Sequence, residues 1–185
     1  SGDNGPPPPP TEIEYANPFQ TGDGNVKTAG TGSGLVAGSL KFEPPVVYVL
    51  DAGSSMRATF DYARTITQLS IKSLADGRKF AVLVAYAAPV DFDAPLSDLG
   101  GSGGELKTFG DGMTAKSGES PAKVLEWLRT VQPGGSTDLA AALRAALAMK
   151  PKSIVLIAAK PVEDAMPAAE DAKQQGVPIV TVGLS

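Results

Sequence analysis

The stretch VVYVLDAGSSM, residues 46–56, joins two kinds of sequence with different structural demands. Residues 46–50 are apolar or aromatic without interruption, which is typical of a strand covered on both faces of a sheet. Asp51 follows directly, and small and hydroxyl-bearing residues then indicate a turn. A carboxylate at the end of a buried strand is costly unless another group pairs with it. Metal binding, phosphate chemistry and turn geometry are the three explanations open at this point.

The composition of the chain excludes several kinds of site. The chain has 185 residues and is 42% hydrophobic, which indicates one folded domain with a tail. It contains no His and no Cys, so disulfides, the usual zinc sites, thiol nucleophiles and imidazole bases are excluded. Its net charge of −4 and its scattered Lys and Arg residues speak against a nucleic-acid partner. No apolar run approaches the ~18 residues of a membrane span, and no signal peptide is recognisable.

The N-terminal part differs in composition from the rest of the chain. Residues 1–34 predict a disordered Pro/Gly-rich linker, and residues 35–185 predict a folded domain. Five prolines at 6–10 predict a stiff tether, and a start at Ser1 rather than Met is typical of an engineered or processed fragment. The alternating glycines at 30–34 are not a dinucleotide loop, because the strand and helix that must flank such a loop are missing.

From residue 45 onward, apolar runs alternate with amphipathic stretches. This alternation predicts an α/β fold with a doubly wound, mainly parallel central sheet flanked by helices, as in Rossmann-like proteins. Residues 87–120 are acidic and Gly-rich and predict a long loop with one edge strand near 105–109. The predicted strands are 46–50, 79–86, 153–159 and 178–184, and the predicted helices are 57–75, 121–131, 138–149 and one from Pro167 to Gly176.

Three of these segments should end at one edge of the sheet. Ligands of open α/β sheets bind beyond the carboxyl ends of the strands, near the switch in strand order. Asp51 ends the first predicted strand, Ala159 ends the third, and the loop PGGSTD (133–138) leads into a helix at the same edge. We therefore expect Asp51, Ser55, Thr137 and Ala159 to cluster, with Asp51 and Thr137 within about two helical turns, ~11 Å.

The order and spacing of four stretches in residues 45–185 resemble a von Willebrand factor type A (VWA) domain. The stretches are VVYVLDAGSSM, GGSTDLAAALRAAL (134–147), KSIVLIAAKP (152–161) and GVPIVTVGLS (176–185). Domains of this family bind Mg²⁺ at a metal-ion-dependent adhesion site, and the resemblance assigns Asp51, Ser55 and Thr137 to ligand positions. The sequence departs from the family at Gly53 and Ala159, where the family has Ser and Asp.

The two departures remove a hydroxyl and a carboxylate from the implied ligand set. Mg²⁺ prefers near-octahedral oxygen ligation. We therefore expect a degenerate, vestigial site without a cofactor, at which Mg²⁺ binds weakly if it binds. The remaining residues also have a structural explanation, because Ser54 or Ser55 can cap one helix and Ser136 or Thr137 the next. Asp51 itself is stabilised if it faces helix N-termini.

The sequence predicts no catalytic centre. Besides lacking His and Cys, the chain has no paired carboxylates at catalytic spacing. Residues Ser120 to Lys123 match the Ser-x-x-Lys motif of penicillin-binding proteins, but its companion motifs are absent. Ser followed by Pro is typical of a helix start, so we expect Ser120 to be a helix cap.

These observations predict a non-catalytic protein-interaction module, of adhesion or scaffold type, that binds another protein. One alternative is a small-ligand or anion-binding doubly wound domain, and another is a VWA domain with a working divalent-metal site. The resemblance suits a cell-envelope, extracytoplasmic protein with a membrane anchor upstream of Ser1, with a cytoplasmic location as the alternative. Family members continue beyond the last predicted strand, so we expect its edge to be covered by residues 35–43 or by self-association.

Overall fold

The structure is a computed structural model that describes residues 34–36, 40–87, 104–159 and 165–184. The predicted linker lies outside these residues except for Gly34, so the boundary between linker and domain stays a prediction. Within the described part of the chain, no helix is long and apolar enough to cross a membrane.

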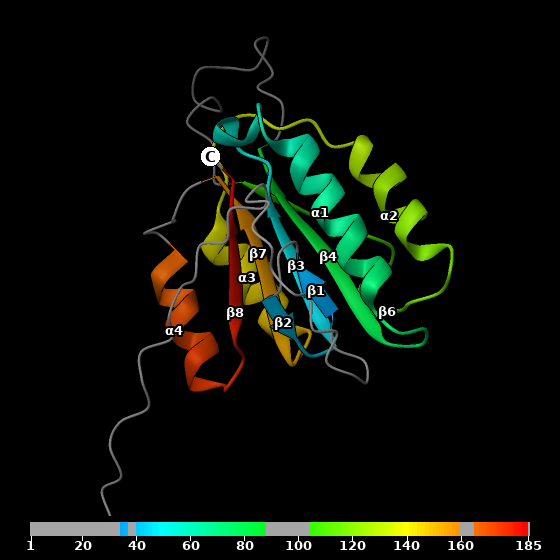
Figure 1. The fold of residues 1–185 in the computed structure, drawn as a ribbon. Coiled ribbons are helices and arrows are strands. Elements are labelled where there is room, and N and C mark those ends of the chain that lie inside the picture. The colour runs from blue at the N-terminus through cyan, green and yellow to red at the C-terminus, as the bar shows by residue number, and fades with distance from the viewer. Residues whose placement is uncertain (1–33, 37–39, 88–103, 160–164, 185) are drawn as a thin grey trace, which may run out of the picture.

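A mixed sheet forms the centre of the molecule (Figure 1). The strand order is β5-β4-β3-β7-β8, and β6 pairs with β4 beside β5. Strands β4, β3, β7 and β8 are parallel to one another, whereas β5 and β6 run antiparallel to β4. The bounds are β3 (Val46–Asp51), β4 (Lys79–Tyr86), β5 (Glu105–Thr108), β6 (Thr114–Ala115), β7 (Ser153–Ala158) and β8 (Ile179–Gly183).

Helices cover both faces of this sheet, so the predicted doubly wound α/β fold is confirmed. Helices α1 and α2 pack on one face, and α3 and α4 pack on the other. The 3₁₀ turn η1 connects β3 to α1. The bounds are η1 (Ser54–Met56), α1 (Phe60–Ser73), α2 (Ser120–Arg129), α3 (Leu139–Ala148) and α4 (Met166–Gln174).

The central strand β3 is buried from end to end, as its unbroken apolar run predicts. Tyr48 faces α1, and its hydroxyl forms a 2.8 Å hydrogen bond with Ser70 of that helix. Burial raises the pKa of Tyr48 above its usual value. Val47 and Val49 face the Ala-rich side of α3. The two faces therefore demand apolar residues at every position of the strand, which is why the run does not alternate.

The described part of residues 35–43 does not cover the edge of the last strand, which was one of the two expected alternatives. β1 (Gly34–Val36) and β2 (Leu40–Phe42) pair only with each other in the described structure and do not join the central sheet. The buried ring of Phe42 meets the ring of Tyr48 edge-on, with centroids 6.0 Å apart, so the hairpin is anchored over β3. The described residues of this segment therefore do not extend the sheet at β8, and self-association is the alternative that remains a prediction.

The helix caps also differ from the prediction. Ser54 and Ser55 form η1, one turn too early to cap α1, whose preceding residue Thr59 makes no side-chain cap. Asp138 caps α3 by accepting a 2.9 Å hydrogen bond from the backbone N–H of Ala141. Ser120 is the first residue of α2 rather than its cap, and its hydroxyl accepts a hydrogen bond from the N–H of Ser117.

Candidate functional site

Asp51 ends β3 at the point where the strand order reverses between β3 and β7. Its side chain is buried, with a relative exposure of 6%. The Oδ1 atom accepts hydrogen bonds from the backbone N–H of Gly53 at 2.8 Å and from the hydroxyl of Thr137 at 2.7 Å. This confirms that Asp51 and Thr137 lie together. It also means that the buried carboxylate is stabilised by donors from the protein itself.

The turn after β3 and the loop before α3 are joined by several hydrogen bonds. The Gly135 carbonyl accepts from the backbone N–H of Ser54 at 2.9 Å and from its hydroxyl at 3.2 Å. In the opposite direction, the Gly134 N–H donates to the Ala52 carbonyl at 2.8 Å. Together with the bond between Asp51 and Thr137, these contacts hold two segments that are far apart in sequence. We call this arrangement the loop junction.

Gly53 fits the loop junction because of space rather than backbone conformation. Its φ of −72° is available to any residue. A Cβ atom there would lie 3.1 Å from Oδ1 of Asp51 and 3.3 Å from Oγ1 of Thr137, closer than ordinary van der Waals contact. A side chain at position 53 would therefore press on the hydrogen bond between these two residues.

Gly135 is required for two reasons. Its φ of +64° lies in the left-handed region that side chains disfavour. A Cβ at this position would also lie 2.4 Å from the Cβ of Ala87. The loop can therefore turn its carbonyl toward Ser54 only with glycine at position 135.

Two of the predicted site residues take no part in the loop junction. Ser55 is exposed in η1, and within the described residues its hydroxyl has no hydrogen-bond partner. Ala159 follows β7 and packs, partly buried, against the core under α1 and α2. The serine that bridges the two loops is Ser54, which the sequence predicted only as a helix cap. No sequence signal distinguishes Ser54 from Ser55, because the 3₁₀ turn decides which hydroxyl faces Gly135.

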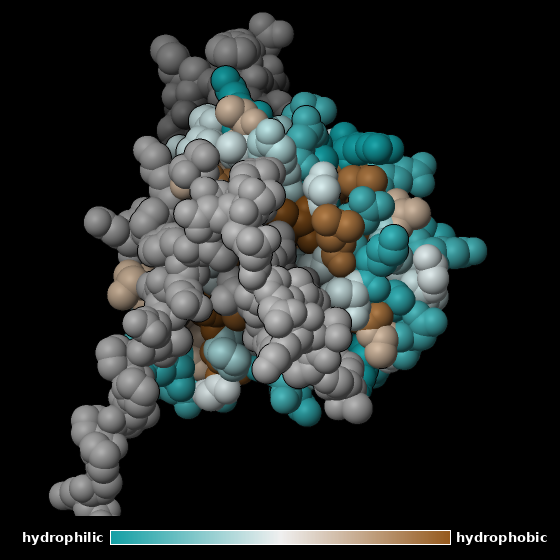
Figure 2. Space-filling view, viewed as in Figure 1, coloured by the Kyte–Doolittle hydropathy of each residue, from teal (hydrophilic) through white to brown (hydrophobic). Residues whose placement is uncertain are grey.

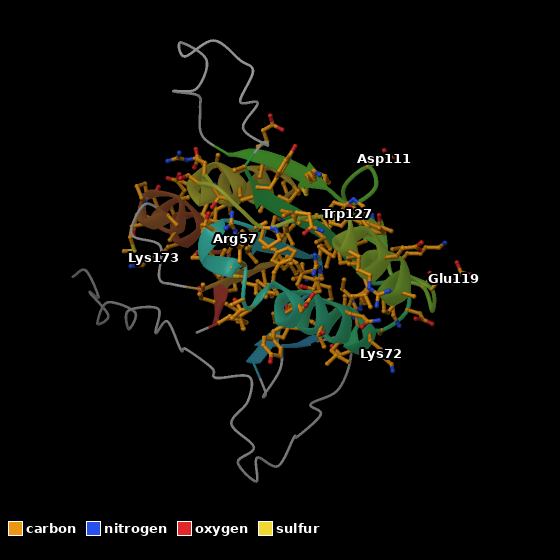
Figure 3. All side chains as sticks on the ribbon, turned by 90° about the horizontal axis from the view of Figure 1, so that it is seen from above. Arg57, Lys72, Asp111, Glu119, Trp127 and Lys173 are labelled. Atoms are coloured by element: carbon orange, nitrogen blue, oxygen red, sulfur yellow. The ribbon has the colours of Figure 1, made fainter. Side chains whose placement is uncertain are left out.

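Arg57 brings a positive charge to the same edge of the sheet. Seen from above, it lies between the layer of α1 and α2 and the layer of α3 and α4 (Figure 3). Its side chain is exposed and lies beside the loop 133–138. The Nη2 atom is only 3.4 Å from where a Cβ of Gly134 would stand. Within the described residues it forms no ion pair. The guanidinium therefore offers donors to solvent or to another molecule.

The described residues offer a small set of metal ligands. They contribute the carboxylate of Asp51 and the hydroxyls of Thr137 and the exposed serines. In the described part of the chain, no three acidic side chains lie close enough together to hold a metal ion. Glu163 and Asp164, which follow β7 in the sequence, lie outside the described residues.

The strand order, the helix layers and Asp51 at the switch point can now be compared with known proteins. One solved structure that matches is described as von Willebrand factor type A from Catenulispora acidiphila, with a TM-score of 0.53. The fold is VWA-like. The two chains are 18% identical, and the match covers 76% of this chain but 33% of the other, so the likeness shows the fold alone. No protein-family model and no curated protein matches the sequence.

Proposed function

We propose that this VWA-like domain is a non-catalytic protein-interaction module, of adhesion or scaffold type, whose metal site is vestigial. The observation that carries the proposal is the direct hydrogen bond between Thr137 and Asp51, with Gly53 packed against it. A metal site needs oxygen lone pairs that point toward a common centre. Here the hydroxyl of Thr137 donates to Oδ1 of Asp51, and this carboxylate oxygen also accepts from the backbone N–H of Gly53.

The charge of the ligand set supports the same proposal. Gly53 and Ala159 supply no oxygen ligand, so Asp51 is the one carboxylate that the family pattern leaves at this site. A divalent ion would have to lose water for the attraction of that single charge. We infer that the domain works without a cofactor, and that the loop junction holds the binding loops in a fixed shape.

The surface that meets the partner is, in this proposal, the edge where the loop junction lies. Exposed serine hydroxyls gather there with the guanidinium of Arg57, which has no ion-pair partner among the described residues, and this suits a partner protein that presents a carboxylate. A Pro-rich tether before a VWA-like domain suits a display role at the cell envelope, outside the cytoplasm.

Metal dependence is tested by thermal unfolding with and without Mg²⁺. Binding to the native state at an ion concentration ten times Kd would add about 1.4 kcal/mol, or roughly 3–5 °C in Tm. We expect no shift for the unmodified protein. The double variant Gly53→Ser, Ala159→Asp restores the ligand types of the family and should show the shift. A shift in the unmodified protein that disappears in Asp51→Ala would mean that the metal site works.

Partner binding is tested with two charge reversals at opposite ends of α1. Arg57→Glu changes the edge of the loop junction, whereas Lys72→Glu changes the far end of α1 (Figure 3). Cross-linking in envelope extracts should capture a protein with the unmodified domain and with Lys72→Glu, but much less of it with Arg57→Glu. Equal capture by both variants would exclude this edge as the binding surface.

A further inference from the structure

The outer strand β8 has backbone groups that face away from the sheet. The N–H of Ile154 in β7 donates to the Pro178 carbonyl at 3.0 Å, and the N–H of Leu184 donates to the Ala158 carbonyl at 2.9 Å. In a parallel ladder, alternate residues turn both of their backbone groups toward the same neighbour. Positions 178, 180, 182 and 184 therefore face β7. The residues whose N–H and C=O groups face outward are Ile179, Thr181 and Gly183.

Within the described structure, these outward groups bond to no other backbone group. Residues 179–183 also carry no charge and no bulge, and the nearest proline, Pro178, precedes the strand. Proteins that keep an edge strand free usually protect it with such features. β8 therefore has both the hydrogen-bonding groups and the composition of a strand that pairs with another one.

Helix α4 adds an apolar side chain above this edge. Asp171 faces α3, where it pairs with Arg144, and Ala168 faces the sheet. At 100° per residue, Met166 and Lys173 lie on the opposite side of α4 from Asp171. Figure 3 agrees, because Lys173 projects from α4 away from α3. Met166 has a relative exposure of 60%, the largest among the exposed large hydrophobic residues described.

We propose that a second copy of this chain pairs with β8 in antiparallel orientation, so that the two sheets become continuous across a two-fold axis at Thr181. The outward positions are symmetric about that residue. Thr181 then faces its own counterpart, and Ile179 faces Gly183 of the partner subunit, each pair exchanging two hydrogen bonds. Gly183 leaves room for the larger Ile179 side chain.

Three features favour a second copy over another peptide. The pattern of outward groups is self-complementary, which an isologous interface requires. No charged residue lies on the strand, so two identical strands bring no like charges into register. The α4 helices of both copies lie on the same face of the joined sheet, where the exposed side chain of Met166 can be covered.

Thr181→Pro is the decisive variant. It removes one outward N–H and leaves the hydrogen bonds to β7 intact. Proline is tolerated in edge strands at positions whose N–H faces outward. Sedimentation velocity should show a dimer for the unmodified chain at about 100 µM, a range typical of weak interfaces. Thr181→Pro should be monomeric with unchanged circular dichroism. A monomer for the unmodified chain at several hundred micromolar would overturn the proposal, as would a Thr181→Pro dimer.

A second pair of variants keeps the test independent of proline. Thr181→Lys places two like charges at the two-fold axis, whereas Thr65→Lys adds the same charge to the exposed side of α1. The first should abolish the dimer, and the second should keep it. Amide exchange identifies the occupant, because the Thr181 N–H should gain protection as protein concentration rises. Protection that does not depend on concentration would mean that the same chain covers the edge, and would exclude the second copy.

Discussion

The loop junction and the β8 edge differ in how their polar groups are hydrogen-bonded. At the loop junction, the carboxylate of Asp51 and the loop carbonyls accept hydrogen bonds from donors of the same chain. Along β8, alternate N–H and C=O groups have no backbone partner among the described residues. Groups that are satisfied internally fix a shape, and groups that are not satisfied can bind another strand. The two proposals rest on this difference: the loop junction would hold the shape of its loops, and the β8 edge would pair with a second copy.

The exposed surface of α1 and α2 provides a third region for comparison. Figure 2 shows mostly hydrophilic side chains toward α2 and a hydrophobic patch over α1. Tyr62 and Leu69 are the exposed large hydrophobic residues of α1, each with about half of its side chain exposed (48% and 53%). They lie two turns apart on α1, whose other face is buried in the core. This patch therefore offers apolar side chains but no strand edge.

The largest expected effect comes from breaking the loop junction at Gly135. Gly135→Ala places a methyl group on a left-handed residue and against Ala87, so we expect a loss of about 3 kcal/mol in unfolding free energy. Gly110→Ala is the matched control, because its φ is +58° but a Cβ there meets nothing within 4 Å. The control should lose only about 1 kcal/mol, the conformational part alone. Urea unfolding measures both, and equal losses would show that the loop yields to the clash.

A smaller loss is expected from Thr137→Val, which keeps the shape of the side chain and removes its hydroxyl. The buried carboxylate of Asp51 then loses one of its two donors, at a cost of about 2 kcal/mol. Thr65→Val removes an exposed hydroxyl whose one bond to a described residue is to the Asp61 carbonyl of its own helix, and should change stability by about 0.5 kcal/mol or less. If both variants unfold at the same urea concentration, the bond between Asp51 and Thr137 contributes nothing to stability.

The sheet could be predicted because a continuous run of apolar residues marks each buried strand in the sequence. Strands β3 and β7 are uninterrupted apolar runs, and the structure moves their ends by a single residue from the predicted bounds. The proximity of Asp51 and Thr137 follows from two parallel-sheet rules and needed no contact to be known in advance. The two-residue strand β6 was missed, since Thr114–Ala115 is too short to show a period.

The details of the loop junction depend on contacts that no local pattern contains. Ser136, Thr137 and Asp138 are all good helix caps, and the one that caps is Asp138, directly before α3, whereas the hydroxyl of Thr137 donates to Asp51. The position of the hairpin is decided in the same way, by the contact of Phe42 with Tyr48. Choices between equivalent neighbours are made by partners distant in sequence, so the sequence predicts the region but not the residue.

The smallest expected effect is the most informative about the metal. Gly53→Ala requires Asp51 and Thr137 to move by a few tenths of an ångström, and we expect a loss of about 1 kcal/mol. Gly118→Ala is a suitable control, because Gly118 is exposed and a Cβ there meets nothing within 4 Å. That control should gain up to about 0.5 kcal/mol through the lower entropy of its unfolded chain.

The sign of this difference decides how rigid the loop junction is. Opposite signs would mean that the hydrogen bond between Asp51 and Thr137 resists opening, so that a serine at position 53 cannot enter the site without cost. If Gly53→Ala is instead as stable as Gly118→Ala, the two residues separate easily. The proposed weakness of Mg²⁺ binding would then rest on the missing ligands alone, and the single change Ala159→Asp should already raise Tm in Mg²⁺.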